Sequence, residues 1–303
     1  MASDRILLAV ALRLSSVAFF ALMNVGIKLA EQSGAALPEI LFWRQAGAGM
    51  LVAAVIASGP GFASLATRRI GAHVLRATIG LITMAFTFYT LTVLPLAEAT
   101  TIGFSMPIFA TILGALILKE PTGWRRWAAV AIGFAGVLVV TRPGGGGHAI
   151  PAVGIATGLS AAVGTATISI LLRTIGKTEQ PLTTVFWFST LSLVPLGLIY
   201  MFTAQPHPVT VWAILLGVGL FGGAGQIAMT TSLKFGPVST VVPMDYTSLI
   251  WATLLGWWVF DRLPAETTWL GAPIIIASGL YIVWREHVRR REETRQAITS
   301  GIA

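Results

Sequence analysis

The chain of 303 residues contains no cysteine and little charge. Without cysteine there can be no disulfide framework and no thiolate ligand for a metal. Asp, Glu, Lys and Arg together make up 11% of the residues, whereas soluble domains carry about a quarter. So low a share means that most of the protein surface faces something other than water.

Hydrophobic residues make up 55% of the chain, and they gather in recurring stretches. A helix of about 20 apolar residues spans a bilayer. The first stretch is too long for a signal peptide and carries Asn24 and Lys28 where a cleavage site needs small residues. We therefore expect an all-α integral membrane protein with ten spans, over 6–30, 39–57, 73–93, 97–118, 124–141, 151–173, 182–203, 211–233, 238–259 and 268–285.

The sequence also lacks the motifs of an intramembrane enzyme. It has no His-Glu-x-x-His and no Gly-x-Ser-x-Gly. The four histidines fall on different connections or span ends: His73, His148, His207 and His287. The glycine run after Pro143 lacks the lysine and hydroxyl of a phosphate-binding loop. We therefore expect no catalytic residues, no metal site and no cofactor.

The net charge of +8 predicts an orientation in the membrane rather than a nucleic-acid partner. With a cytoplasmic N-terminus, only Lys28, Arg142 and Arg262 fall outside, and Arg44 lies within a span. The other 16 of the 20 basic residues fall on the inner side, including the run 289–291. Basic loops stay in the cytoplasm. We expect a multi-pass protein of a bacterial-type inner membrane, with both termini cytoplasmic.

A repeated five-residue motif divides the chain into two halves. Ala110–Gly114, Ala-Thr-Ile-Leu-Gly, returns 142 positions later as Ala-Thr-Leu-Leu-Gly at Ala252–Gly256. Five spans per half is an odd number, so the second half enters the membrane from the opposite face. We expect inverted repeats over 1–143 and 151–285, joined by the glycine-rich 144–150 and followed by a basic tail at 286–303. Such repeats place a substrate site near the midplane.

These features resemble a known family. Ten spans in two halves, with Ala97-Glu98-Ala99, Pro107 and Lys119-Glu120, resemble the EamA-type members of the drug/metabolite transporter superfamily. Within it the chain resembles the YddG-like exporters of aromatic and hydrophobic amino acids. The resemblance implies a cavity lined by the first, third, fourth, sixth, eighth and ninth spans. The second half departs from the pattern, with Leu249 in place of the proline and Asp261-Arg262 in place of the Lys-Glu pair.

Asp245 is the most informative polar residue within a span, about seven residues into the ninth. A charge at this depth is costly and needs a reason. Asp245 either binds an ammonium group or carries a proton, or it is locked to a neighbouring helix. The other candidate contacts with substrate are Asn24, Tyr89, Ser105, Met106, Trp187, Gln226, Tyr246 and Trp251. For the polar residues among these, packing between helices is the alternative role. For Met106, Trp187, Tyr246 and Trp251, it is a lipid-facing or core position.

Lys28, Arg44 and Glu98 approach the outer mouth in this topology, with Glu31 and Glu39 beside them. They form either a structural ion-pair cluster or a gate that closes by pairing, and the deeper Arg44 can meet a substrate carboxylate.

Pro107 and Pro243 stand within the fourth and ninth spans, at similar places in the two halves. A proline inside a helix leaves a carbonyl unpaired and bends the axis. They mark either the binding region or harmless kinks.

Together these features predict a secondary carrier that exports small metabolites by alternating access. Hydrophobic and aromatic amino acids are the expected cargo, with the lipid bilayer as surroundings, a monomer as the working unit and no nucleic-acid partner. The alternatives are a carrier of another metabolite or cationic drug, such as a nucleoside, vitamin or quaternary amine, or a passive channel.

Overall fold

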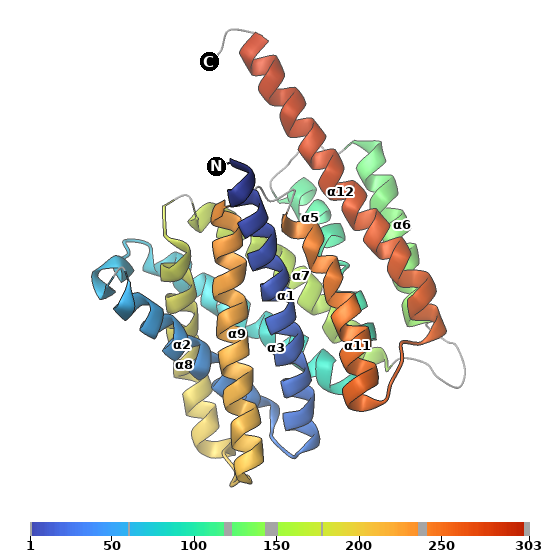
Figure 1. The fold of residues 1–303 in the computed structure, drawn as a ribbon. Helices are drawn as coiled ribbons and strands as arrows, with labels where there is room; N and C mark the ends of the chain where they lie inside the picture. Colours follow the sequence, from blue (N-terminus) through green and yellow to red (C-terminus); the bar gives the residue numbers. More distant parts are fainter. Residues whose placement is uncertain are drawn as a thin grey trace.

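The structure is a computed structural model that describes residues 2–59, 61–117, 123–142, 151–176, 178–235 and 241–299. Over these ranges it is a bundle of helices (Figure 1). The elements are α1 (Ala2–Gln32), α2 (Leu37–Ser58), η1 (Phe62–Leu65), α3 (Ile70–Val93), α4 (Leu96–Gly103), α5 (Met106–Leu116), α6 (Trp124–Thr141), α7 (Ala152–Ile175), α8 (Pro181–Thr203), α9 (Val209–Phe235), η2 (Val242–Thr247), α11 (Ser248–Phe260) and α12 (Glu266–Thr299).

Nine stretches within the described ranges are helical, long and apolar enough to cross a membrane. The remaining expected span, 238–259, starts outside those ranges and continues as the 3₁₀ helix η2 followed by α11. The all-helical membrane architecture predicted from composition is confirmed. Figure 1 shows both ends of the chain at the same end of the bundle, as an even number of crossings requires, with the last part of α12 extending beyond it.

The fourth and ninth spans are interrupted helices rather than continuous ones. Pro107 has no N–H to donate to the carbonyl of Gly103, so the helix stops at Gly103 and resumes at Met106. The turn between is tightened by a bond from Ser105 N to Ile102 O at 3.0 Å. Pro243 stands at the start of η2, and α11 begins at Ser248. Met106 and Ser248 are 142 residues apart, which is also the offset between the two copies of the repeated motif in the sequence.

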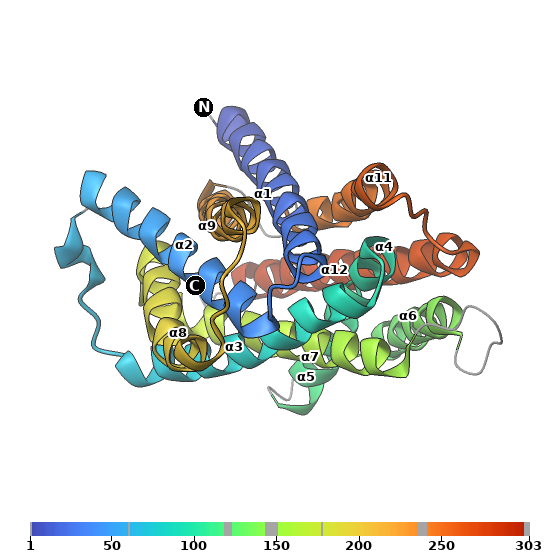
Figure 2. The same ribbon diagram turned by 90° about the horizontal axis from the view of Figure 1, so that it is seen from below.

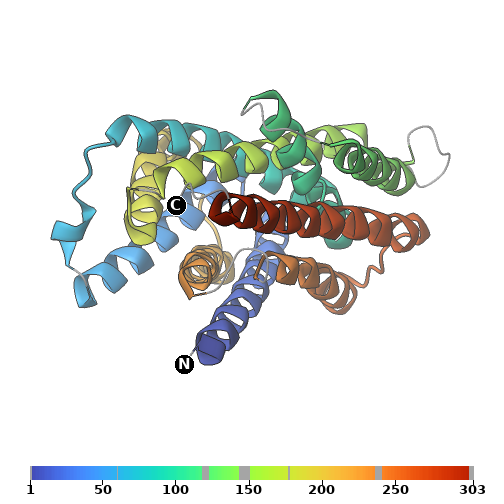
Figure 3. The ribbon, with the colours of Figure 1, turned by 90° about the horizontal axis from the view of Figure 1, so that it is seen from above.

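Helix packing follows the same two-fold relation. The contact of α1 with α9 has its counterpart in the contact of α7 with α3, and that of α2 with α9 in that of α8 with α3. The pairs α6–α12 and α2–α8 each join equivalent helices of the two halves. Seen along the bundle, α6 and α12 lie at one end of the elongated cross-section and α2 and α8 at the other (Figures 2 and 3). This is the arrangement of two inverted five-helix repeats.

Small residues allow the closest of these helix contacts. A Cβ atom on Gly47 of α2 would lie 2.6 Å from the Cα atom of Gly219 on α9, and one on Gly219 would lie 2.5 Å from the carbonyl oxygen of Trp43. Only glycine lets the two backbones approach this closely, as is common between membrane helices. The contact fixes α2 against α9, one of the helices that line the cavity described next.

Candidate transport cavity

A cavity of about 380 Å³ lies between α1, α3, α4, α7, α9 and the η2–α11 segment. These are the six spans that the family resemblance implied, so that prediction is confirmed. The volume is within the range of small-molecule sites. Its walls are formed by Arg13, Ser16, Val17, Phe20, Ala21, Asn24, Thr87, Thr90, Leu91, Leu96, Ala99, Thr100, Gly103, Phe104, Gly158, Ala161, Ala162, Thr165, Met229, Asp245, Ser248, Ala252 and Leu255.

Asp245 lines this cavity and is paired with Arg13. Arg13 Nε donates to Asp245 Oδ1 at 2.6 Å, and Arg13 Nη2 donates to Oδ2. The Arg13 side chain is 8% exposed and that of Asp245 is 41% exposed. Asp245 is therefore bound to a neighbouring helix and open to the cavity at once, which joins the two roles considered from the sequence. The bidentate pair ties α1 in the first half to η2 in the second.

The two helix interruptions meet at the cavity wall. The ring of Phe104, which ends α4, packs edge-on against Tyr246 of η2 with centroids 4.9 Å apart. The Tyr246 hydroxyl is buried and has no hydrogen-bond partner among the described residues. Gly103 lines the cavity, and because of Pro107 its carbonyl lacks the usual partner one turn later. The interruptions therefore expose a backbone carbonyl to the cavity and bring two aromatic rings together at its wall. A regular helix would keep that carbonyl paired.

Hydroxyl and amide groups dominate the polar part of the wall. Thr90 Oγ1 is held by the Phe86 carbonyl and by Thr157, and Ser16 Oγ donates to the Gly225 carbonyl. Three other polar side chains make no hydrogen bond within the described part of the protein: Asn24, Thr100 and Ser248. These three are available to a bound molecule. Most of the wall is apolar, and since Arg13 and Asp245 neutralise each other, its few polar groups carry no net charge.

Of the contacts predicted from the sequence, the structure places Asn24 and Asp245 in the cavity wall and most of the others elsewhere. Ser105 is fully buried and donates to the Ile102 carbonyl. Met106 begins α5, next to the helix interruption, and Gln226 is buried on α9. Tyr89 and Trp251 are 37% and 38% exposed and are not among the residues that line the cavity.

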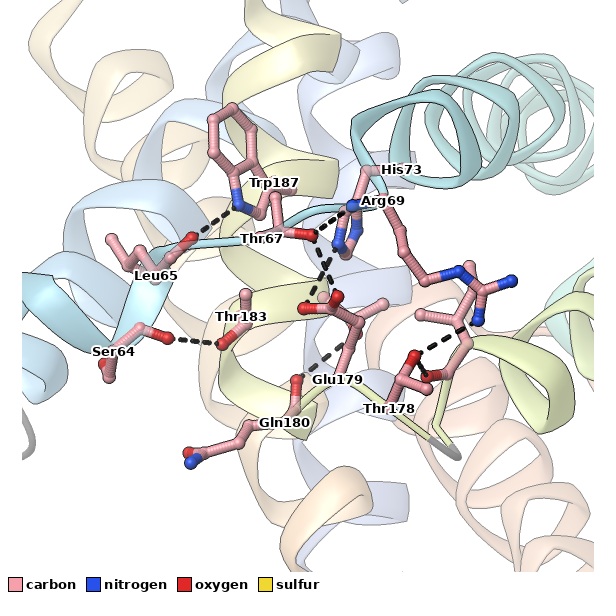
Figure 4. Close-up of polar contacts among 12 residues, drawn as sticks. Ser64, Leu65, Thr67, Arg69, His73, Thr178, Glu179, Gln180, Thr183 and Trp187 are labelled. Atoms are coloured by element: carbon pink, nitrogen blue, oxygen red, sulfur yellow. Dashed lines mark hydrogen bonds and ion pairs between the residues drawn. The ribbon is translucent and has the colours of Figure 1, made fainter.

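Trp187 belongs to a polar cluster near the start of α8 (Figure 4). Its indole Nε1 donates to the Leu65 carbonyl at 3.1 Å, and its ring stacks on His73. In the same cluster Thr67 donates to Glu179, whose carboxylate lies 3.7 Å from His73 Nε2. These contacts fasten the segment before α3 to the connection between α7 and α8. Trp187 therefore has a structural partner and does not line the cavity described above.

The charges expected to form one cluster at the outer mouth are held at separate helix ends. Lys28 Nζ donates to the carbonyls of Leu91 and Leu94 at the end of α3. Glu98 accepts from the backbone N–H of Ala265 before α12, at 2.8 Å. These are the backbone groups that a helix leaves unpaired at its termini.

Glu39 and Arg44, the other members of that group, also have separate surroundings. Glu39 accepts from the N–H groups of Ala36 and Gln205 and contacts His207. Arg44 lies deeper, bonded to Gln45. No ion pair joins Lys28, Arg44 and Glu98 in the described residues.

The sequence interpretation missed the cavity roles of Arg13 and of the threonines on α3 and α7. Arg13 was counted among the inner-side charges, although it stands within the first apolar stretch and its cost in a membrane pointed to a partner. Thr87, Thr90 and Thr165 carry no comparable signal, because threonine is common on membrane helices and its hydroxyl bonds readily to the preceding turn.

Known proteins resemble this chain over most of its length. It is 29% identical to a riboflavin transporter of Vibrio cholerae over 233 residues, 76% of this chain and 77% of the relative. It is 26% identical to an S-adenosylmethionine uptake transporter of Rickettsia prowazekii over 226 residues, 74% and 75% of the two chains. It is 25% identical to a pseudopaline exporter of Pseudomonas aeruginosa over 264 residues, 86% and 90% of the two chains.

A solved crystal structure shares the fold, with a TM-score of 0.62 at 20% identity over 94% of this chain and 98% of the other. The model of the EamA-like transporter family matches residues 7–142 and again residues 152–284. The two matches cover both halves of the inverted repeat. The chain belongs to the EamA-like transporter family of the drug/metabolite transporter superfamily, and it is a membrane transporter of small metabolites rather than an enzyme.

Proposed function

We propose that this protein carries a hydroxyl-bearing heteroaromatic metabolite of the vitamin or nucleoside class through the cavity between α1, α3, α4, α7, α9 and α11. The observation that carries the proposal is the composition of the wall. The hydroxyls of Thr100 and Ser248 and the amide of Asn24, which have no partner in the described residues, lie with the rings of Phe20 and Phe104 in the mostly apolar wall of a space of about 380 Å³. Four further hydroxyls of the wall donate to backbone carbonyls and can only accept from a cargo: Ser16, Thr87, Thr90 and Thr165. Hydroxyl groups match a polyol or ribose chain, and the rings match a flat heterocycle.

The relatives support this cargo class over the amino acids expected from the sequence. One is named for riboflavin and another for S-adenosylmethionine, and none of the three is named for an amino acid. One relative is named as an uptake transporter and another as an exporter, so we assign no direction to transport by this protein, although the sequence predicted export.

A zwitterionic amino acid stays as the second candidate because of one observation. Arg13 and Asp245 place a cation and an anion side by side at the wall, where they can pair with a carboxylate and an ammonium group.

Transport would proceed by alternating access between the two inverted halves. The Arg13–Asp245 pair bridges the halves at the end of the cavity nearer the termini. The excess of basic residues at that end of the bundle supports a cytoplasmic position for both termini in a bacterial-type inner membrane. In that orientation the ion pair closes the cytoplasmic side of the cavity, and opening on that side requires it to separate.

Counterflow in proteoliposomes tests the proposal. Vesicles with purified protein are preloaded with riboflavin, adenosine, phenylalanine or buffer alone, and entry of labelled riboflavin and labelled phenylalanine is followed. Saturable exchange of riboflavin or adenosine supports the proposed cargo. Exchange of phenylalanine alone supports the second candidate, and linear flux without counterflow indicates a channel instead of a carrier.

A matched pair of variants ties the activity to the cavity. Ala161→Phe places a ring into the cavity from α7, whereas Ala135→Phe adds the same ring on the exposed face of α6. The first change should lower counterflow by about tenfold or more, a loss of binding near 1.4 kcal/mol, and the second should leave it unchanged. Equal rates in both variants would contradict transport through this cavity.

A further inference from the structure

Two buried arginines outside the cavity wall face one aromatic ring. Arg44 of α2 and Arg76 of α3 are each 6% exposed. The guanidinium carbon of Arg44 lies 5.8 Å from the centroid of Phe188 on α8, and that of Arg76 lies 4.2 Å from it. Each arginine stands about 10 Å in from the start of its own helix. Because α2 and α3 run in opposite directions, the two side chains reach Phe188 from opposite ends of the bundle.

No acid among the described residues neutralises either charge. Within the described ranges, the ion pairs of the protein involve neither Arg44 nor Arg76. Arg44 Nε and both Nε and Nη1 of Arg76 are buried without a hydrogen-bond partner there. Contact with the Phe188 ring returns only part of the lost hydration. Two adjacent uncompensated cations within membrane-spanning helices are among the most costly arrangements in a protein.

Further unpaired polar atoms stand on α2 and α8, next to Arg44 or to Phe188 along the chain. Gln45 Nε2, Ser189 Oγ and Ser192 Oγ are buried and lack partners in the described part of the chain. Gln45 receives the Arg44 Nη1 bond through its oxygen, so its amide N–H groups remain free to donate. Ser192 follows Phe188 by one helical turn and so shares its face of α8. All the guanidinium and amide nitrogens here are donors, and the hydroxyls can donate as well.

The two guanidinium groups pack directly against helix backbone at positions where glycine stands. A Cβ atom on Gly80 would lie 2.1 Å from Arg76 Nη1 and 2.7 Å from the Phe188 ring. A Cβ atom on Gly222 of α9 would lie 3.4 Å from Arg44 Nε. Such close surroundings favour a small ion over an organic molecule. A water molecule can satisfy donors but cannot neutralise charge, whereas an anion does both.

We propose that Arg44 and Arg76, together with Gln45, Ser189 and Ser192, form a binding site for a small inorganic anion of the chloride type between α2, α3 and α8. The site is separate from the transport cavity, because neither arginine lines that cavity. Its ion holds the two halves together, since α2 and α3 belong to the first repeat and α8 to the second. Occupancy is therefore expected to stabilise the folded carrier.

Thermal unfolding of the purified full-length protein in detergent tests this site. The protein is exchanged into sodium gluconate at constant ionic strength, and chloride, bromide, nitrate or acetate is titrated in. Chloride and bromide should raise Tm saturably by about 5 °C in the wild type, as expected for a ligand that binds only the folded state. Arg76→Gln should abolish the response, and the exposed Arg68→Gln should retain it.

A second measurement keeps the test decisive if Arg76→Gln does not fold. Crystals of the wild type grown with bromide should show an anomalous peak between the two guanidinium groups, while Arg76→Lys should bind bromide more weakly because it lacks the guanidinium fork. A Tm that ignores every anion, or an equal response in Arg76→Gln, would overturn the proposal. A response to acetate without one to chloride or bromide would also overturn it, and would assign the site to a carboxylate.

Discussion

Arg13 on α1 donates hydrogen bonds to both carboxylate oxygens of Asp245 on η2, although the two residues are 232 positions apart in the chain. The pair lies at the cavity wall, where the arginine is nearly covered and the aspartate is partly open. An ion pair in this place has two consequences. It fixes the short 3₁₀ segment η2 to α1, and it presents the uncovered side of a carboxylate to any molecule in the cavity.

Replacing Asp245 by asparagine should preserve the fold and reduce transport. Asparagine keeps one oxygen as an acceptor for Arg13 but removes the negative charge, so the arginine charge at the wall is no longer neutralised. We expect the initial rate of counterflow to fall by about tenfold, a difference near 1.4 kcal/mol. Asp261→Asn is the matched control, because Asp261 is exposed and its left-handed backbone conformation, with φ of 52°, suits asparagine.

The combined variant then separates charge balance from cargo binding. If Asp245 acts only through Arg13, the double variant Arg13→Gln/Asp245→Asn should recover most of the lost rate, because the cavity becomes neutral again. If Asp245 binds the cargo or a proton directly, the double variant should stay as slow as the single one. Wild-type rates in Asp245→Asn itself would show that the residue has neither role.

Glu98 should prove to be a helix cap and not part of a gate. Its Oε1 atom accepts from the N–H of Ala265 and from the hydroxyl of Thr268 at the start of α12. Glu98→Gln retains an oxygen acceptor, so it should cost less than about 1 kcal/mol in the free energy of unfolding. Glu98→Ala removes the acceptor of both donors, leaves the buried Thr268 hydroxyl without this partner, and should cost about 1–3 kcal/mol.

Transport by the folded fraction distinguishes the two roles of Glu98. A cap predicts wild-type counterflow per folded molecule in Glu98→Gln, whereas a gate that depends on the carboxylate charge predicts a changed rate. Glu266→Gln serves as the control, since Glu266 is exposed in the first turn of the same helix.

The architecture could be predicted from the sequence because its signals are long and repeated. The apolar stretches predicted the spans. The repeat of Ala110–Gly114 predicted the two halves, and the odd number of spans in each half predicted that they are inverted. Pro107 and Pro243 stand at the start of α5 and η2, where regular helix gives way, since the missing N–H acts locally and is visible in the sequence. What remained unpredicted about these spans is that their interruptions meet, through Phe104 and Tyr246.

The site was harder to predict because it depends on which helix face meets which neighbour. Charged residues in spans identified Asp245, but nothing in the sequence connects it to Arg13, which lies in the other half. Lys28 and Glu98 seemed to form a cluster because both approach the same mouth. Each instead binds backbone at a helix end, and free backbone groups at helix ends leave no trace in an apolar sequence.

The orientation can be measured directly because the chain has no native cysteine. Arg68 precedes α3 at the end of the bundle that holds both termini, and Arg142 follows α6 at the opposite end; both side chains are exposed. We expect a membrane-impermeant maleimide added to intact cells to label Arg142→Cys and not Arg68→Cys. Permeabilised cells should give labelling of both. Labelling of Arg68→Cys alone in intact cells would reverse the orientation, and labelling of both would contradict the number of crossings between them.

The crossing of α2 and α9 should be the most sensitive point of the bundle to a single added methyl group. A Cβ atom on Gly47 would meet the backbone of Gly219 at 2.6 Å, and a backbone cannot move aside as a side chain can. Gly47→Ala should therefore destabilise the protein by about 1–3 kcal/mol, the usual cost of overpacking.

Gly71→Ala is the control, because its new Cβ would meet nothing within 4 Å and alanine favours a helix over glycine by about 1 kcal/mol. Thermal unfolding of the two variants in the same detergent should move Tm in opposite directions. A Gly47→Ala protein as stable as the wild type would mean that α2 and α9 can separate freely, and the helix contacts would then be looser than this packing requires.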